Sequence, residues 1–283
     1  MKKKIIAIIG TGLIGGSFAI QLHEKKISSK IIGVDSNKEN LRNAFDLELV
    51  DEMASLHKAI ERSHIIILAI PVDEIIRILP EILDRINDKQ MVIDLGSSKQ
   101  QITEIIKDHP LRRRYLAAHP MWGTEYSGPQ AAVKGAFENK AVILCNTEES
   151  DSAVVCWAYY AFGKIGMRVS EMNAASHDLH AAYVSHISHI TSFALANTVL
   201  EKEKEEQAIF TLASAGFEST VRLAKSNAAM WVPIFMQNKE NILDVLDEHI
   251  SQLEKFRGAI KNDDRESLHH LIEGANKIRK IIK

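Results

Sequence analysis

Residues 4–15 read KIIAIIGTGLIG, a short apolar run that passes directly into a glycine-rich turn. The run predicts a buried strand over 4–9, and the apolar residues from Leu13 onward predict a helix. Similar apolar runs alternate with amphipathic stretches as far as residue 170. The further strands are expected over 31–34, 65–69, 91–94, 115–118, 141–145 and 167–170. This alternation is typical of a doubly wound parallel sheet, which predicts an α/β fold for the first part of the chain.

The glycine spacing predicts a function for the first turn. Gly10 allows the turn to be tight, Gly12 lets backbone N–H groups approach a pyrophosphate, and Gly15 lets the helix pack against the strand. A helix N-terminus favours negative charge, so the backbone at Leu13 and Ile14 would complete the phosphate site. We therefore predict a Rossmann-type dinucleotide site at the end of the first strand.

An acidic residue, Asp35, follows the second predicted strand twenty residues after Gly15. A carboxylate there accepts hydrogen bonds from both ribose hydroxyls of NAD and repels the 2′-phosphate of NADP. Lys38 is a nearby cation that would favour NADP instead. We predict NAD as the cofactor; the alternative is an ordinary glycine turn with Asp35 on the surface.

The pattern changes near residue 170. From Asn173 onward no strand is expected, and apolar residues recur at helical spacing. We therefore predict a nucleotide-binding domain over 1–170 and an all-α domain over 171–283. No Pro-rich linker separates the two, which favours a shared interface and a ligand cleft at their junction.

The composition excludes several classes of protein. A length of 283 residues, 46% of them apolar and 25% charged, fits two ordinary globular domains. The net charge of −2 leaves no basic surplus, so nucleic acid is not expected as a partner. No apolar run reaches the roughly 18 residues of a membrane span, so no membrane contact is predicted. Two cysteines, Cys145 and Cys156, fit a reducing cytoplasm.

Two polar positions follow predicted strands at the edge of the sheet where ligands bind. Ser97 can cap the next helix and can reach a substrate hydroxyl or the nicotinamide, and the two roles are compatible. His119 ends a strand, is fixed by Pro120, and opens a polar loop that contains Glu125. A neutral histidine there can take a proton from an alcohol while hydride leaves the carbon, with activity falling below an apparent pKa of about 6–7. The alternative is a hydrogen-bonded structural histidine.

Four histidines and an aspartate fall within residues 177–189, which suggests a metal site. At about 100° per residue, His177 and His186 lie on opposite sides of one helix. The same holds for His180 and His189, so we predict no metal and instead a polar helix that faces a ligand. His186 and His189 share a face and can line a pocket together.

Two later residues each allow a structural and a functional interpretation. Arg222 stands on an otherwise apolar stretch and is either a surface residue or a bidentate binder of a carboxylate. Asn227 precedes a predicted helix, where it either caps that helix or contacts the substrate.

Five segments together make this chain resemble the prephenate dehydrogenase family, which includes the related arogenate dehydrogenases of tyrosine biosynthesis. They are Gly10–Gly15, Asp94–Lys99, His119–Gly128, His177–His189 and Gly216–Trp231. The similarity spans most of the chain, and the histidine-rich segments are specific as a set. It implies oxidative decarboxylation of prephenate to 4-hydroxyphenylpyruvate with reduction of NAD.

The resemblance also implies roles for particular residues. His119 would be the catalytic base and Ser97 its hydrogen-bonding partner near the substrate hydroxyl. Arg222 would bind a substrate carboxylate, His189 would line the site, and Glu125 would be a polar gate near Arg222.

Substrate choice and assembly follow from the same resemblance. Asn227 stands where many relatives carry aspartate, and a neutral amide favours prephenate over arogenate, whose ammonium would need a carboxylate. The family pairs through its helical domain, which predicts a homodimer.

Two alternative functions remain: a β-hydroxyacid dehydrogenase, whose base is a lysine in the helical domain, and a protein that only senses NAD.

Overall fold

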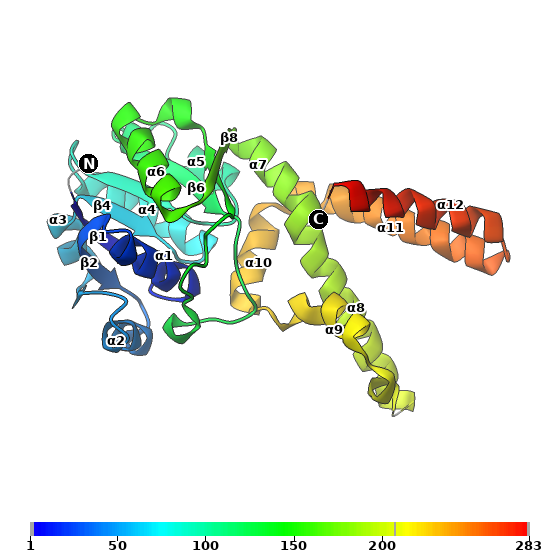
Figure 1. Cartoon of the computed structure of the whole chain (residues 1–283). Helices are drawn as coiled ribbons and strands as arrows, with labels where there is room; N and C mark the ends of the chain where they lie inside the picture. The colour runs from blue at the N-terminus through cyan, green and yellow to red at the C-terminus, as the bar shows by residue number, and fades with distance from the viewer. Residues whose placement is uncertain (1–2, 207, 282–283) are drawn as a thin grey trace. The chain divides into compact units, whose positions relative to one another are not determined.

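The computed structural model describes residues 3–206 and 208–281, and an eight-stranded sheet forms the centre of its first part (Figure 1). The strands lie in the order β3-β2-β1-β4-β5-β6-β7-β8. Their bounds are β1 Lys4–Ile9, β2 Ser28–Val34, β3 Glu52–Met53, β4 Ile65–Leu68, β5 Met91–Asp94, β6 Tyr115–Pro120, β7 Ala141–Cys145 and β8 Arg168–Met172. The order reverses between β1 and β4, which creates the switch point where doubly wound sheets bind ligands.

The sheet is parallel except at one pair of strands. β1 runs parallel to both β2 and β4, whereas β6 and β7 are antiparallel, with His119 opposite Ile143. The connection from β6 to β7 contains a short 3₁₀ turn, Pro129–Ala131, in place of a crossover α-helix. A chain that returns without a crossover helix pairs antiparallel. The predicted doubly wound α/β fold is confirmed, with this one exception to the parallel order.

Helices cover both faces of the sheet, so its central strands are buried on both sides. Ile65 and Ile67 of β4 pack in one apolar cluster, and Ile66 and Leu68 pack in another on the opposite face. Burying such side chains contributes about 1.5–3 kcal/mol each. The covering helices are α1 Leu13–Glu24, α2 Lys38–Asp46, α3 Leu56–Arg62, α4 Val72–Arg85, α5 Gln100–Glu104 and α6 Ser152–Ile165.

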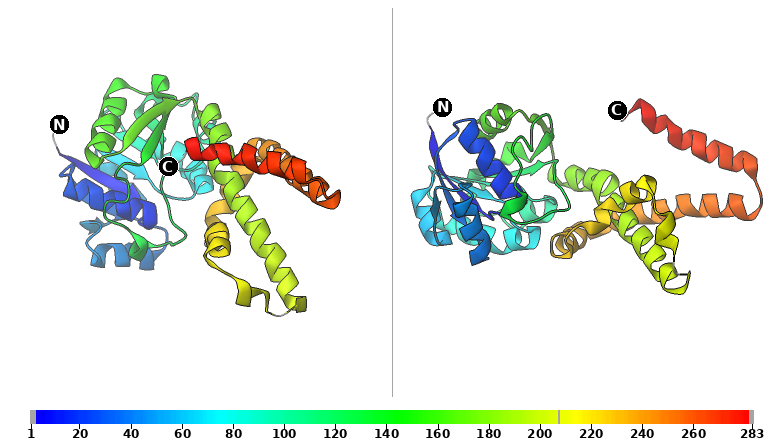
Figure 2. Two further views of the ribbon diagram at one scale, coloured as in Figure 1. Left: turned by 45° about the vertical axis from the view of Figure 1, so that its right-hand side comes forward. Right: turned by 60° about the horizontal axis from the view of Figure 1, so that its bottom comes forward.

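The described residues after β8 form helices and no strand, as the helical spacing predicts. Their bounds are α7 Ala174–Ala181, η4 Ala182–His186, α8 Ile187–Glu206, α9 Ala215–Val221, α10 Ala228–Gln237, α11 Lys239–Lys261 and α12 Arg265–Asn276. η4 is a π-helical turn, and Figure 2 shows α7, η4 and α8 as one continuous rod. No helix in the described ranges is long and apolar enough to cross a membrane.

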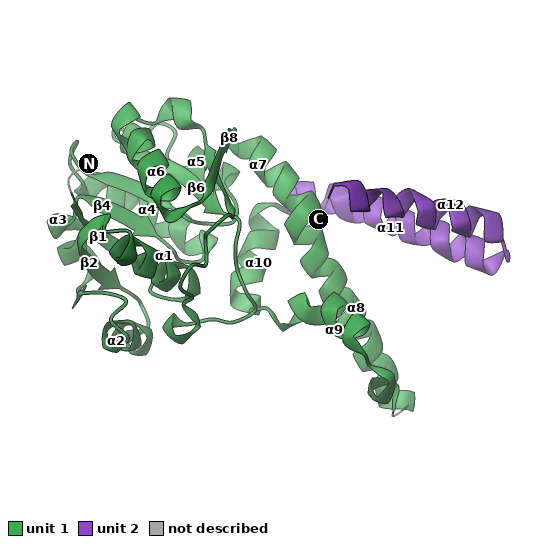
Figure 3. Cartoon of the chain, viewed as in Figure 1, with its two compact units in different colours: residues 1–238 green, residues 239–283 purple. Residues whose placement is uncertain are grey.

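The chain divides into two compact units, residues 1–238 and residues 239–283 (Figure 3). The described part of the second unit contains α11, α12 and the 3₁₀ turn Lys277–Lys280. The first unit extends past the predicted boundary because Trp231 and Ile234 of α10 belong to the same apolar cluster as α4. The strands end at Met172, close to residue 170, and the predicted domain boundary there stays a prediction.

Candidate active site

The glycine turn after β1 is shaped by close backbone approaches and leaves one side open. Gly10 has a φ of +92°, and a Cβ on it would meet the Ala69 carbonyl oxygen at 2.3 Å. A Cβ on Gly15 would lie 1.9 Å from the Gly10 carbonyl oxygen, so both positions need glycine for the fold itself. A Cβ on Gly12 would meet nothing nearer than 4.0 Å. The space in front of Gly12 is therefore available for a nucleotide pyrophosphate.

A cavity of about 310 Å³ lies in front of this turn. Eight of the residues predicted for the site line it: Gly10, Gly12, Leu13, Ile14, Asp35, Ser97, Glu125 and Asn227. Met230 and Ile234 of α10 contribute apolar walls. The cavity is thus formed from both sides of residue 170. Gly15, His119, His189 and Arg222 are not among its lining residues.

Asp35 lies just past the end of β2 and ties the glycine turn to that strand. Its Oδ2 accepts hydrogen bonds from Thr11 N at 2.9 Å and Thr11 Oγ1 at 3.0 Å, and its Oδ1 accepts from Asn37 N at 2.9 Å. These bonds hold the carboxylate at the rim of the cavity, where a ribose would approach.

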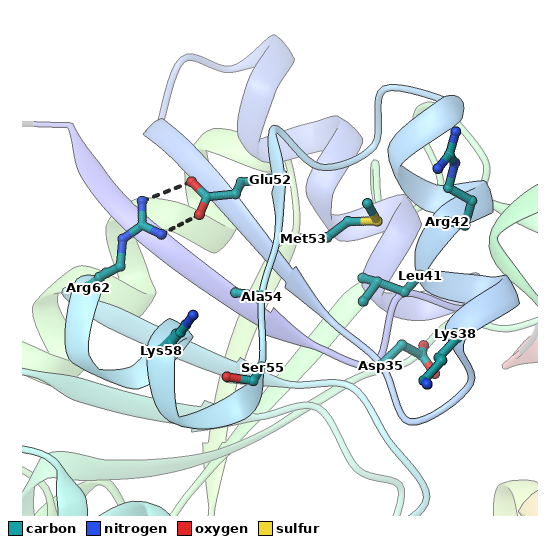
Figure 4. A pocket seen from close by; sticks show the side chains of 10 residues that line it. All are labelled: Asp35, Lys38, Leu41, Arg42, Glu52, Met53, Ala54, Ser55, Lys58 and Arg62. Carbon is teal, nitrogen blue, oxygen red and sulfur yellow. Dashed lines mark hydrogen bonds and ion pairs between the residues drawn. The ribbon is translucent and has the colours of Figure 1, made fainter.

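A second, more open cavity of about 750 Å³ lies on the other side of Asp35 (Figure 4). Arg62 makes a two-pronged ion pair with Glu52 in it, and Arg62 together with Lys30 lowers the pKa of Glu52 to about 2. Lys38 and further cationic side chains also line this space. Lys38, the cation next to Asp35, therefore belongs to a larger charged surface beside the predicted ribose position.

His119 lies at the carboxyl end of β6 and is buried. Its Nδ1 lies 2.8 Å from His177 Nε2, and the two rings meet edge to face. Burial lowers the pKa of His119 well below its usual range, and His177, Lys99 and His186 lower it further. His119 is therefore neutral at physiological pH and able to accept a proton.

Asp178 completes a chain of side chains behind His119. Its Oδ1 lies 2.7 Å from His177 Nδ1 and accepts the backbone N–H of Lys99 at 2.8 Å. Its Oδ2 accepts the backbone N–H of Gln100 at 2.9 Å. The structure thus places Asp178 where Ser97 was expected: α5 begins at Gln100 and its first amides bind Asp178. The interpretation of Ser97 as a helix cap is wrong.

A buried ionic network of Lys99, Asp94 and Tyr115 stabilises the ends of the strands next to His119. Lys99 Nζ donates to a carboxylate oxygen of Asp94 and to the Ala118 carbonyl oxygen at 3.0 Å. Tyr115 donates its hydroxyl to the other oxygen of Asp94 at 2.5 Å. Burial and Asp94 raise the pKa of Tyr115 well above its usual range, so the phenol stays protonated. Lys99 thereby links the ends of β5 and β6 to α7.

The regular helical geometry that we expected for the histidines is wrong, because the π turn η4 inserts a wider turn between them. His177 and His186 are both buried. Burial, with a contribution from His177, lowers the pKa of His186 to about 4. Asn238 donates from Nδ2 to His186 Nδ1 at 3.1 Å. No group of three or more His, Cys, Asp or Glu side chains suited to a metal occurs in the described ranges.

His189 and Arg222 lie on the helical side of the site. His189 stacks on Trp231 with ring centroids 3.4 Å apart, and His186 meets the same indole edge to face. Burial lowers the pKa of His189, and Arg222 lowers it further. Arg222, in the 3₁₀ turn Arg222–Lys225, reaches the cavity through Glu125, with Nη1 3.4 Å from Oε2.

Asn227 has both of the positions that we considered for it. Its Oδ1 accepts the backbone N–H of Ala229 at 2.8 Å, so it caps α10, and it also lines the cavity. Sequence reasoning missed Asp178, Lys99 and Asp94 as partners of the histidines. The signal available was weak: the polar segment Asp94–Lys99 and the pair His177-Asp178, which lie far apart in the chain.

The switch point, the open glycine turn and a neutral histidine at the end of a strand are features of dinucleotide-dependent oxidoreductases. Comparison with family models specifies the group. Residues 18–171 match the model "Prephenate dehydrogenase, nucleotide-binding domain", and residues 173–274 match "Prephenate dehydrogenase, dimerization domain". The chain belongs to the prephenate dehydrogenase family, which confirms the resemblance of its segments.

Individual relatives agree over almost the whole chain. The prephenate dehydrogenase of Bacillus subtilis is 30% identical over 280 residues, which cover 98% of this chain and 76% of that one. The cyclohexadienyl dehydrogenase of Zymomonas mobilis is 28% identical over 99% of this chain and 96% of its own. A prephenate dehydrogenase structure from A. aeolicus, in complex with hydroxyphenyl propionate and NAD+, superposes with a TM-score of 0.88 at 29% identity, covering 99% of each chain.

Proposed function

We propose that this chain catalyses the oxidative decarboxylation of prephenate to 4-hydroxyphenylpyruvate and carbon dioxide, with NAD as the oxidant. The glycine turn and Asp35 would hold NAD, which would supply the acceptor for the hydride of the carbon that carries the ring hydroxyl. His119 accepts the proton of that hydroxyl. The ring carboxylate leaves as carbon dioxide, its bonding electrons complete the aromatic ring as a phenolate, and the phenolate oxygen takes the proton back from His119. Membership of the prephenate dehydrogenase family and the NAD+ complex of the A. aeolicus relative support this reaction.

The observation that carries the proposal is the state of His119. A general base must be unprotonated at working pH, and burial beside His177 and Lys99 lowers the pKa of His119 well below its usual range. The position of His119 at the carboxyl end of β6, the edge of the sheet that binds ligands, favours this role over a purely structural one.

The other predicted residues have positions that suit binding roles. Asp35 would accept the ribose hydroxyls of NAD, and the backbone from Gly12 would face its pyrophosphate. Ser97 lines the cavity and would donate to the substrate hydroxyl. Arg222 would keep Nη1 on Glu125 and bind a substrate carboxylate with the rest of its guanidinium, because a guanidinium binds carboxylates through two parallel hydrogen bonds.

Prephenate is favoured over arogenate by the carboxylates of the cavity. Among its described lining residues these are Asp35 and Glu125. Asp35 already accepts three hydrogen bonds, and Glu125 faces Arg222, so neither is left to neutralise an ammonium. Asn227 adds a neutral amide that can donate to a keto oxygen.

The test is a side-by-side assay of NADH formation with prephenate and with arogenate. We expect a higher kcat/KM with prephenate, and no turnover of either compound would refute the proposed function. Asn227→Asp should raise arogenate turnover relative to prephenate, since an added carboxylate pairs with the ammonium. If Asn227 acts only as the cap of α10, the ratio will not move, because aspartate caps about as well.

We also propose that the chain is a homodimer through its helical region. Residues 173–274 match the family's dimerization domain. Several large apolar side chains in this region are exposed in the single chain, among them Val184, Leu212, Met236 and Ile260. Covering such side chains favours association. Light scattering that shows a monomer at micromolar concentration would contradict the dimer. Cytoplasmic location stays a prediction, in keeping with the free thiols of Cys145 and Cys156.

A further inference from the structure

A line of three buried side chains ends on His119, and the atoms that they present decide where its protons lie. Asp178 is the fixed end of the line. Its carboxylate accepts the backbone N–H groups of Lys99 and Gln100 and lies against His177 Nδ1. A carboxylate at neutral pH has no proton to donate. The hydrogen bond at 2.7 Å between Asp178 and His177 therefore needs the proton on His177 Nδ1.

The next link follows from the tautomers of a neutral imidazole, which carries one N–H and one bare nitrogen. In a neutral His177 with its proton on Nδ1, Nε2 is bare and can only accept. His119 Nδ1 lies 2.8 Å from that nitrogen, so His119 must donate from Nδ1. A neutral His119 then has a bare Nε2, which is the nitrogen left for a substrate proton.

We propose that Asp178, acting through His177, holds His119 in the Nδ1–H tautomer and so makes Nε2 the atom that accepts the substrate proton. His177 and Asp178 are positioning residues in this arrangement, since they act through His119. The inference rests on the proposed function only for the identity of the proton donor. The tautomer itself is a property of the protein alone.

The position of Asp178 is fixed from several elements. The backbone of Lys99 and Gln100 binds its carboxylate, and Asn238 Nδ2 donates to its carbonyl oxygen at 2.6 Å. Lys99 Nζ in turn binds the carbonyl oxygen of Ala118, the residue that precedes His119. The acceptor for His177 is thus tied to the strand that carries the base, which keeps the ring-to-ring distance constant.

The charged and titratable groups around His119 come from four elements. His177 and Asp178 belong to α7, His186 to the π turn η4, and Lys99 to the turn between β5 and α5. Asp94, which balances the charge of Lys99, ends β5. Removing His177 therefore changes the proton acceptor of His119 Nδ1 and leaves Lys99 with Asp94 in place.

The first experiment reads the tautomers directly by long-range ¹H–¹⁵N NMR of the protein labelled in its histidine rings. We expect His119 and His177 to be protonated on Nδ1 and bare on Nε2 at pH 7. Protonation of His119 on Nε2 would overturn the inference. The measurement needs no turnover, so an enzyme that shows these tautomers and fails to oxidise prephenate would refute the proposed function alone.

The second experiment compares two substitutions at one position. His177→Leu removes both nitrogens, and we expect kcat to fall about 10²-fold or more while KM and NAD affinity stay within about threefold. His177→Gln retains an amide that can donate to Asp178 and accept from His119, and we expect it to regain at least tenfold of the lost kcat. A purely structural role would show no such recovery at equal melting temperature.

The control is His180→Asn, which removes an exposed histidine from the same helix and should leave kcat unchanged. Wild-type kcat in the His177→Leu variant would overturn the inference, and so would equal losses in the leucine and glutamine variants. If the leucine variant does not fold, the wild-type tautomers measured by NMR decide the question.

Discussion

Acid should destabilise the folded chain through His186, and the structure gives the size of the effect. His186 lies in the π turn η4, fully buried, with Nδ1 accepting a hydrogen bond from Asn238 Nδ2 at 3.1 Å. If Nδ1 were protonated, its N–H would face the N–H of Asn238 Nδ2, and neither buried donor would have an acceptor in the other. Burial is the main cause that lowers the pKa of His186 to about 4 from 6.5, with His177 and His189 adding to it and Asp178 opposing it.

The sign of the effect follows from proton uptake. Between pH 6.5 and about 4 the unfolded chain binds a proton at His186 that the folded chain refuses. The contribution of His186 to the free energy of unfolding is therefore complete above pH 6.5 and is lost as the pH drops through this window. At about 1.4 kcal/mol per pH unit, the loss reaches about 3 kcal/mol by pH 4.

The assay is urea unfolding at a series of pH values from 8 to 4, on the wild type and on His186→Asn. The asparagine can still accept from Asn238 and does not titrate. The variant should be less stable at pH 8 and should lose about 3 kcal/mol less than the wild type on going to pH 4. His180→Asn, at an exposed histidine, should keep the wild-type slope. Equal slopes in the wild type and His186→Asn would refute the reasoning.

Four further predictions concern the site and the glycine turn. His119→Asn should bind NAD and lose at least about 10²-fold in kcat, and full activity in the variant would exclude His119 as the base. The wild-type kcat should fall only well below the pH of about 6–7 expected for an ordinary histidine, because the buried ring is active when unprotonated. Gly15→Ala should cost about 1–3 kcal/mol or more in urea unfolding. Gly12→Ala should leave the melting temperature unchanged and weaken NAD binding by about tenfold or more, whereas unchanged affinity would mean that no phosphate passes there. Because of Asp35, kcat/KM should be much higher with NAD than with NADP, and comparable values would point to the cations of the second cavity.

The sequence by itself determined the fold and identified the glycine turn that is the candidate dinucleotide site. A strand buried on both faces needs a continuous apolar run, and a helix that covers it needs periodic apolar residues, so both leave a local pattern. The glycine turn is local in the same way, because Gly10, Gly12 and Gly15 act through their own backbone. The two-residue strand Glu52–Met53 is not predicted by any such pattern, since so short an edge leaves none.

Only the tertiary structure decided which groups surround the candidate base. His177 lies 58 residues from His119, and Asp178 lies 79 residues from Lys99, whose amide it binds. A side chain's hydrogen-bonding capacity can be read from its type, but its partner depends on where the sheet and helices bring it. The π turn η4 is a second example. This wider turn shifts the face of the helix on which His186 lies, so the positions calculated for regular helical spacing are wrong. Local patterns reflect which side chains must be buried, because hydrophobicity is a property of each residue itself. Hydrogen-bond partners are set by packing between distant segments.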